Sequence, residues 1–261
     1  MSKLTVLVTG GAGYIGSHAV LALTDAGWPV AVIDDLSNGS REAVPDSIPF
    51  YEGNIADRAL VERILGEQHI QAIMHFAGSI VVPESVENPL KYYENNTLAS
   101  HALICAAVAA GVKHILFSST AAVYGVPETV PIGEDDPKAP INPYGASKLM
   151  TERMLADASA AHPFNFGALR YFNVAGADAK GRTGQIGKGS THLIKVACEA
   201  AVGKRESIAV YGTDYPTPDG TCIRDYIHVS DLADAHVAAL EWLVEHPGEN
   251  LVLNCGYGKG L

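Results

Sequence analysis

The sequence predicts an α/β protein built on a doubly wound parallel β-sheet. Through the first two-thirds of the chain, short apolar runs rich in Val and Ile alternate with longer segments of helical periodicity. Most of the short runs are apolar throughout, as expected for strands that helices cover on both faces. Strands and helices that alternate in this way connect by right-handed crossovers, which place the strands parallel in one sheet.

The elements of this sheet follow one another along residues 1–175, which we expect to form one domain. The predicted strands cover residues 4–9, 30–34, 48–52, 72–76, 114–118 and 164–170. The predicted helices between them cover residues 14–26, 58–67, 98–110 and 144–160.

Residues 176–261 differ in character and predict a smaller lobe that is partly interleaved with the sheet. A Gly-, Lys- and Asp-rich stretch over 173–190 predicts a loop long enough to have a function. Ser230 is the predicted N-cap of a helix that ends at residue 245. The other elements expected here are a helix over 191–202, a strand over 207–211, a polar loop over 212–221 and a strand over 251–254.

Composition excludes several classes of protein. With 18 Lys and Arg against 29 Asp and Glu, the net charge of −11 disfavours binding to nucleic acid or acidic lipid, although a locally basic pocket is still compatible with it. The 4 cysteines lie far apart, which argues against a disulfide framework or a zinc site. The longest apolar stretch, 102–112, is too short to span a membrane, and the N-terminus leaves no room for a signal peptide. We therefore expect a cytoplasmic protein without a metal site.

A glycine-rich segment separates the first predicted strand from the first predicted helix. It can be read as Gly10-x-x-Gly13-x-x-Gly16 or as Gly11-x-Gly13-x-x-Gly16. In both readings the glycines permit a tight turn and let backbone amides approach a pyrophosphate, whose charge the helix N-terminus stabilises. The segment therefore predicts a dinucleotide site.

Two acidic residues at the end of the next predicted strand support this site. A carboxylate there, at Asp34, would accept hydrogen bonds from the hydroxyls of a ribose. Asp34 and Asp35 together would repel a 2′-phosphate, so the sequence favours NAD over NADP.

A second motif places a tyrosine and a lysine on one helix face. Tyr144 and Lys148 are four residues apart in a predicted helix, so their side chains point the same way. A neighbouring ammonium lowers the pKa of a tyrosine from about 10 and makes it a usable general base. Such a pair is common on protein surfaces, but this one follows a dinucleotide motif and a strand that ends in hydroxyls. Of these hydroxyls, Thr120 would assist Tyr144, whereas Ser118 and Ser119 also suit the closing of the strand and capping of the next turn.

Together these motifs resemble the extended short-chain dehydrogenase/reductase superfamily and, within it, the UDP-glucose 4-epimerases. The resemblance covers nearly the whole chain, and its last two segments are specific to the epimerases. Thr120 is followed by Ala121 and Ala122, where the related 4,6-dehydratases carry an Asp-Glu pair, which argues against elimination of water. The segments are TGGAGYIGSH (9–18), HFAG (75–78), SSTAAVYG (118–125), PYGASK (143–148), LRYFNVAGA (169–177) and YGTDYPTPDGTCIRDYIHVSDLADAH (211–236).

The resemblance implies a Rossmann-type fold and interconversion of UDP-galactose and UDP-glucose. Tyr144, assisted by Thr120, would take the proton of the sugar 4-hydroxyl while hydride passes from C4 to NAD. The hydride would then return to the other face of the 4-keto sugar. Lys148 would hold the nicotinamide ribose, and NAD would stay bound from one cycle to the next.

The resemblance also assigns site residues. Those implied for the cofactor are Gly10, Gly13, Tyr14, Ile15, Gly16, Asp34, Asp35, Asn38, Asn54, Ile55, Phe76, Ala77, Gly78, Asn95, Ser118, Tyr144, Lys148 and Phe172. Those implied for the UDP-sugar are Thr120, Tyr144, Asn173, His192, Leu193, Ala209, Tyr211 and Arg224. Arg224 would meet the diphosphate, and Tyr211 would pack against uracil. The chain departs from the family pattern at Ile80 (Lys in many relatives), Asn54 (Asp), Thr120 (Ser) and His192 (Asn).

Further expectations and alternatives follow from the resemblance. Relatives dimerise through the helices that match 98–110 and 144–160, so a homodimer is expected. The match also predicts that the chain stops before the end of the substrate lobe. A non-catalytic NAD-binding sensor or scaffold, and another enzyme of the superfamily such as a nucleotide-sugar dehydratase or reductase, are the alternatives. The sugar is a hexose, an N-acetylhexosamine or a pentose.

Overall fold

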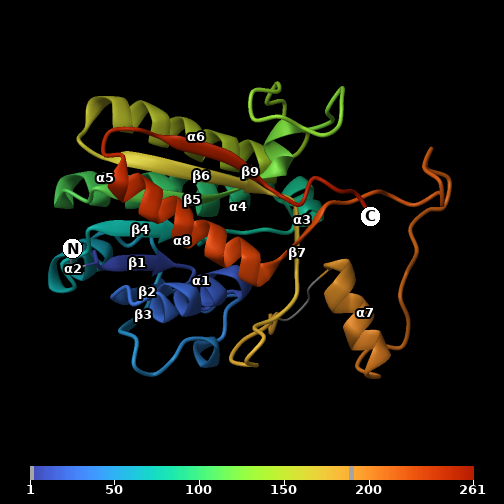
Figure 1. Cartoon of the computed structure of the whole chain (residues 1–261), viewed down its shortest axis with the longest axis horizontal. Helices are drawn as coiled ribbons and strands as arrows, with labels where there is room; N and C mark the ends of the chain where they lie inside the picture. The colour runs from blue at the N-terminus through green and yellow to red at the C-terminus, as the bar shows by residue number, and fades with distance from the viewer. Residues whose placement is uncertain (1–2, 188–190) are drawn as a thin grey trace.

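A parallel sheet with helices on both faces forms the body of the molecule (Figure 1). The computed structural model describes residues 3–187 and 191–261. The seven strands run in the order β3-β2-β1-β4-β5-β6-β9, and every neighbouring pair is parallel. The predicted doubly wound parallel sheet is thereby confirmed. The strands are β1 (Val6–Thr9), β2 (Val30–Asp34), β3 (Phe50–Glu52), β4 (Ala72–His75), β5 (His114–Thr120), β6 (Asn165–Tyr171) and β9 (Leu251–Cys255).

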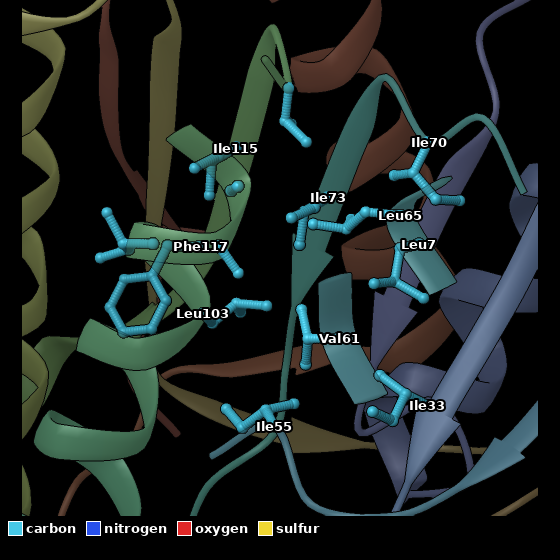
Figure 2. Packing of buried hydrophobic residues seen from close by; sticks show 14 of the residues in the cluster. Leu7, Ile33, Ile55, Val61, Leu65, Ile70, Ile73, Leu103, Ile115 and Phe117 are labelled. Atoms are coloured by element: carbon cyan, nitrogen blue, oxygen red, sulfur yellow. The ribbon is translucent and has the colours of Figure 1, made fainter. Parts of the chain in front are cut away.

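Two apolar layers hold the helices to this sheet. Successive side chains of a strand point to opposite faces, so Leu7 of β1 joins one layer, while Val6 and Val8 join the other. The layer around Leu7 packs under α2 (Arg58–Glu67), α5 (Ala99–Ala110) and α6 (Pro143–Ala161), and Figure 2 shows its tightly packed Ile, Leu and Val side chains. The opposite layer packs under α1 (Tyr14–Asp25) and α8 (Val229–Glu245).

The C-terminal part leaves the sheet and returns to it. After β6 a short strand, β7 (Asn173–Ala175), pairs in parallel with β8 (Tyr226–His228). Between them lies α7 (Leu193–Ala201), which stands away from the sheet and contains no buried residue (Figure 1). The chain then re-enters through α8 and β9, so the C-terminal segment is interleaved with the sheet, as predicted.

Several local predictions are wrong. The expected strand over 207–211 is not formed, because no strand in the described part of the chain lies beside it to complete its hydrogen bonds. The expected N-cap Ser230 lies inside α8. The cap is His228, whose Nδ1 accepts a hydrogen bond from the Ser230 amide at 3.2 Å. The loop expected over 173–190 starts with β7, and its last residues, 188–190, lie outside the described residues.

Short helical elements surround the strand ends and were not predicted. Asn88 caps one of them, the helix that begins at Pro89, by accepting a hydrogen bond from the Lys91 amide. The elements are η1 (Arg41–Ala43), α3 (Val82–Glu87), α4 (Pro89–Tyr92), the π-helical turn η2 (Tyr93–Leu98) and η3 (Ala121–Tyr124).

Candidate active site

A cavity of about 920 Å³ opens at the carboxyl ends of the parallel strands. This edge is where ligands bind in doubly wound sheets. Every residue predicted for the cofactor lines the cavity. Of the residues predicted for the substrate, Leu193, Ala209 and Tyr211 lie away from its wall, and Tyr211 is 99% exposed. The substrate residues on the wall are Thr120, Tyr144, Asn173, His192 and Arg224.

The glycine-rich turn between β1 and α1 is too tight for side chains. Gly10 has a φ of +70°, and a β-carbon on Gly16 would lie 2.1 Å from the Gly10 carbonyl oxygen. Gly13 is the N-cap of α1, and among the described residues no side chain caps this helix. The turn and the positive end of the helix dipole therefore fit a diphosphate, as a bound dinucleotide requires.

The two acidic residues after this turn have structural partners that the sequence did not reveal. Asp34 accepts hydrogen bonds from the Ala12 amide at 2.9 Å and the Leu36 amide at 2.8 Å, so it braces the glycine-rich turn. Burial raises the pKa of its carboxyl above the usual range, although these bonds oppose the effect. Asp35 accepts a hydrogen bond from the Asn54 amide at 3.0 Å. Both carboxylates line the cavity and disfavour a 2′-phosphate on the ribose, which fits NAD and not NADP.

The residues predicted to do chemistry meet where β5 ends and α6 begins. Thr120 is the last residue of β5, and Tyr144 and Lys148 occupy the first turns of α6, all on the cavity wall. The start of α6 is well defined, because Asn142 caps it by accepting from the Gly145 amide at 2.8 Å. The sequence prediction that these three side chains share one site therefore agrees with the geometry.

Lys148 is buried on the cavity wall, next to Ser118. Nζ donates a hydrogen bond to the Ser118 carbonyl oxygen at 2.9 Å and lies 4.8 Å from the centre of the Phe117 ring. Burial lowers the pKa of Lys148 to about 8, and the negative charge of Glu152 opposes this. Lys148 is therefore charged at neutral pH but close to losing its proton.

The phenol of Tyr144 behaves differently from the sequence prediction. Removal from solvent raises its pKa, and only the hydroxyl of Thr120 acts in the lowering direction. The ammonium of Lys148 donates its hydrogen bond to the Ser118 carbonyl and not to the phenol. The protein alone thus keeps Tyr144 protonated at neutral pH, and its activation as a base depends on what enters the cavity.

Comparison with known proteins assigns the chain to a family. The model of the NAD dependent epimerase/dehydratase family matches residues 6–256. The chain belongs to this family. The resemblance drawn from the motifs is confirmed.

Individual relatives of this family are similar over nearly the whole chain. A UDP-glucose 4-epimerase from Azospirillum brasilense is 64% identical over 255 residues, which cover 98% of this chain and 73% of the relative. The crystal structure of UDP-glucose 4-epimerase from Brucella ovis in complex with NAD has a TM-score of 0.95 at 48% identity, covering 99% of this chain and 79% of the other. The epimerase from Bifidobacterium longum, in complex with NAD⁺ and UDP, has a TM-score of 0.93 at 41% identity, covering 98% and 79%.

Two residues of this epimerase/dehydratase site escaped the sequence prediction. Tyr171 lines the cavity, and its hydroxyl is hydrogen-bonded to Ser118 Oγ. Asn96 is buried and joins two walls, because it accepts from the Ser79 amide at 2.7 Å and donates to Ser147 Oγ at 3.0 Å. The signals that point to them are the LRYFN segment and the adjacent amides of Asn95 and Asn96.

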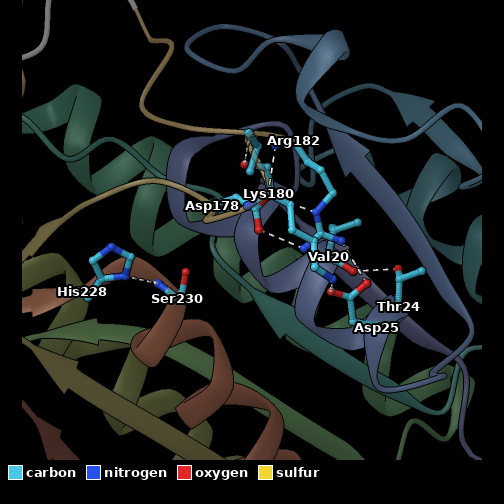
Figure 3. Close-up of polar contacts among 10 residues, drawn as sticks. Val20, Thr24, Asp25, Asp178, Lys180, Arg182, His228 and Ser230 are labelled. Atoms are coloured by element: carbon cyan, nitrogen blue, oxygen red, sulfur yellow. Dashed lines mark hydrogen bonds and ion pairs between the residues drawn. The ribbon is translucent and has the colours of Figure 1, made fainter.

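The segment that follows β7 is fastened to the outside of α1 (Figure 3). Arg182 forms ion pairs with Asp25 and with Asp178, both at 2.9 Å. Closer to the cavity, the Tyr14 hydroxyl donates to the Gly176 carbonyl oxygen at 2.7 Å. Helix α1, which follows the glycine-rich turn, thus also holds the segment after β7 in place.

Membrane-spanning helices and metal-binding clusters are both absent from residues 3–187 and 191–261. Every helix in that part of the chain is too short or too polar to cross a membrane. The same residues contain no group of three or more His, Cys, Asp or Glu side chains able to hold a metal ion.

Proposed function

We propose that this chain is an NAD-dependent nucleotide-sugar 4-epimerase that interconverts UDP-galactose and UDP-glucose. The observation that carries the proposal is the meeting of Thr120, Tyr144 and Lys148 on the wall of a cavity that also contains the glycine-rich turn. The relatives support it, since they are named UDP-glucose 4-epimerases and one of them is bound to NAD⁺ and UDP. A non-catalytic sensor would have no use for these three side chains.

The chain's own residues suit proton transfer at a sugar hydroxyl. When bound, NAD supplies a nicotinamide that can accept a hydride and give it back. Tyr144 would take the proton of the 4-hydroxyl and return it, which is general acid–base chemistry. The hydroxyl of Thr120 would orient that oxygen, and the charge of Lys148 would favour the phenolate. Because Thr120 is followed by Ala121 and Ala122, no acid stands beside it to eliminate water.

Charge in the cavity supports a diphosphate ligand. The cations on its wall are Lys91, Lys148 and Arg224. Lys91 is paired with Glu84, and Lys148 is directed to a backbone carbonyl. Arg224 has no carboxylate partner in the described part of the chain, so it would meet the diphosphate of the UDP-sugar. We infer that Leu193, Ala209 and Tyr211 complete the substrate site from the segment around α7.

We also infer a homodimer, a domain division and a location. Leu98 and Met150 are apolar yet 63% and 46% exposed, and the side chain of Thr97 contacts Met150, so η2 and α6 present one continuous face. A second copy of the chain would cover it.

Residues 1–175 would form the NAD-binding domain and 176–261 a substrate lobe interleaved with it. The free cysteines fit the reducing cytoplasm.

The test is product analysis without added reductant. Purified protein is denatured to release and identify bound nucleotide, and native protein is then incubated with UDP-glucose, UDP-N-acetylglucosamine and a UDP-pentose. NMR of the products is expected to show the 4-epimer. A keto or deoxy sugar would instead indicate a dehydratase, and an unchanged UDP-sugar panel with unreduced cofactor would indicate a sensor.

A further inference from the structure

A buried ion pair lies behind the lysine of the candidate active site. Glu152 follows Lys148 by one turn of α6 and faces Arg170 of β6. Arg170 binds it through two parallel contacts, Nη2 to Oε2 at 2.6 Å and Nε to Oε1 at 3.0 Å. The side chains of Arg170 and Glu152 are only 6% and 7% exposed. Ser119 Oγ donates a further hydrogen bond to Glu152 Oε1, so both carboxylate oxygens have partners.

Stability alone is a weak reason for such a pair. Removing two charges from water is costly, and well-packed apolar residues often serve a buried site as well or better. We therefore look for a role in which the ion pair sets the charge or the position of a neighbouring group. The residues around it identify that group.

The groups that face Lys148 from each packed element include a single carboxylate. On β5 the Ser118 carbonyl accepts from Nζ. On β4, burial lowers the pKa of His75 to about 3, so its ring is neutral. The phenols of Tyr144 on α6 and Tyr171 on β6 are kept protonated by burial, which raises the pKa of each. Within the described chain, this leaves Glu152 as the negative charge that supports the ammonium, with the Arg170 cation behind it.

Arg170 connects the pair to the rim of the cavity. Its Nη1 donates to the Tyr124 hydroxyl at 2.8 Å and to the Glu134 carbonyl oxygen at 3.2 Å. Tyr124 in turn donates to Asn254 Oδ1 at 2.7 Å, and Asn254 Nδ2 donates to the carbonyl oxygen of Ile132 at 3.0 Å. Ile132 lines the cavity, so one polar network runs from beneath Lys148 to the edge of the site.

We propose that Glu152, held in place by Arg170, is a positioning residue that keeps Lys148 charged and oriented for proton transfer at Tyr144. The proposal rests on the proposed function, because it assigns Lys148 a role in that reaction. Arg170 on β6 and Ser119 on β5 both donate to the Glu152 carboxylate, so this side chain of α6 is held from two strands. Glu152 touches no reacting atom and acts only through Lys148.

The test compares Glu152→Gln with the native protein. Glutamine keeps the shape of the side chain but removes its charge and leaves Arg170 unpaired. The lysine ε-carbons are labelled with ¹³C, the Lys148 resonance is assigned by its loss in Lys148→Met, and its titration is followed by NMR. We expect the midpoint to fall by about one pH unit in E152Q, since a nearby opposite charge is worth at least that much. The alkaline limb of the epimerase pH profile should move down by the same amount, a shift that a purely structural role would not produce.

Asp157→Asn is the matched control. Asp157 lies on the exposed face of the same helix, where it pairs with Arg153 at 3.0 Å. The substitution changes the net charge by the same amount as E152Q. It should change neither the titration midpoint of Lys148 nor the alkaline limb of the pH profile of activity.

A second variant covers the case in which E152Q does not fold. Glu152→Gln with Arg170→Met removes both charges together, which leaves no unpaired ion. Its Lys148 midpoint should lie between those of the native protein and E152Q, since Glu152 is on the lysine's own helix face and its loss dominates. An unchanged midpoint in whichever variant folds overturns the proposal. Because the NMR titration needs no substrate, a native protein that turns over no UDP-sugar while the midpoint falls as expected would refute the proposed function alone.

Discussion

A β-carbon placed on Gly16 would lie 2.1 Å from the carbonyl oxygen of Gly10, across the turn that joins β1 to α1. Because the obstacle is backbone, the turn must move to admit even one methyl group. Gly16→Ala should therefore displace the backbone amides that would face the diphosphate of the cofactor. Losing one charge-assisted hydrogen bond, about 1.5–3 kcal/mol, weakens cofactor binding roughly tenfold or more. The measurement is the amount of nucleotide released on denaturing the purified protein.

Gly66→Ala is the control for this variant. Gly66 lies in α2, where an added β-carbon meets nothing within 4 Å. Alanine favours a helix over glycine by up to about 1 kcal/mol, so this variant should keep its cofactor and gain slight stability. Equal cofactor content in both variants would contradict the role given to the turn.

Tyr144→Phe should separate proton transfer from binding. The change removes the hydroxyl that would take the proton and keeps the ring on the cavity wall. We expect kcat to fall by about 10²–10⁴, the usual contribution of a positioned acid or base. Bound NAD should be retained and should no longer be reduced on adding a UDP-sugar, which is followed by absorbance. Reduction at the native rate would rule out Tyr144 as the base.

The activity should decline as pH rises through about 8, the pKa to which burial lowers Lys148. Below that pH Lys148 carries the positive charge that would favour the Tyr144 phenolate in the loaded site, and above it the ammonium has lost its proton. The measurement is kcat/KM from pH 6 to pH 10. Arginine stays charged over this range, so the residual activity of Lys148→Arg should lack the decline. A flat native profile up to pH 10 would be incompatible with a required ammonium.

Acid should destabilise the fold through buried histidines. Burial lowers the pKa of His236 to about 4, and among the described residues its Nε2 has no hydrogen-bond partner. Below the ordinary histidine pKa of about 6.5, His236 binds a proton in the unfolded chain but stays neutral in the folded one. The free energy of unfolding therefore decreases as the pH is lowered, by up to about 1.4 kcal/mol per pH unit, until about pH 4. His75, with a pKa of about 3, adds a similar slope.

Urea unfolding at pH 7 and at pH 5.5 measures this slope. His236→Met should reduce it by about one proton, since methionine fills irregular space without titrating. The exposed His101→Ala should leave it unchanged. A slope of equal size in all three proteins would mean that His236 titrates normally in the fold.

Sequence reasoning succeeded where local chemistry decides the structure. The glycines around Gly13, the acid at Asp34 and the spacing of Tyr144 and Lys148 all depend on the immediate backbone, and all line the cavity. The strands were found because burial on both faces leaves a continuous apolar run. The ends of helices and strands were predicted less well, since a helix end depends on which nearby side chain hydrogen-bonds to the free backbone amides. At α8 this side chain is His228 and not Ser230.

The parts that failed depend on partners distant in sequence. Residues 207–211 have a strand-like composition, but a strand needs a neighbouring strand to complete its hydrogen bonds. Asn173 and Tyr226 do pair, although the whole α7 segment separates them in sequence. The pKa of Tyr144 was misjudged for the same reason. Its spacing from Lys148 suggested that the ammonium lowers the pKa of the phenol directly. No sequence pattern shows that this ammonium donates its hydrogen bond to the Ser118 carbonyl.

The place of β9 at the sheet edge has a consequence for how the chain folds as it is synthesised. Strands β1 to β6 leave the ribosome first, and β6 then remains an unpaired edge until Leu251 can align with Gly167. Asn254, which ties Tyr124 and Ile132 to the polar network, arrives with that same strand. That part of the cavity rim therefore forms only after β9 has been synthesised, and nascent chains halted before β9 carry an open strand edge prone to aggregation.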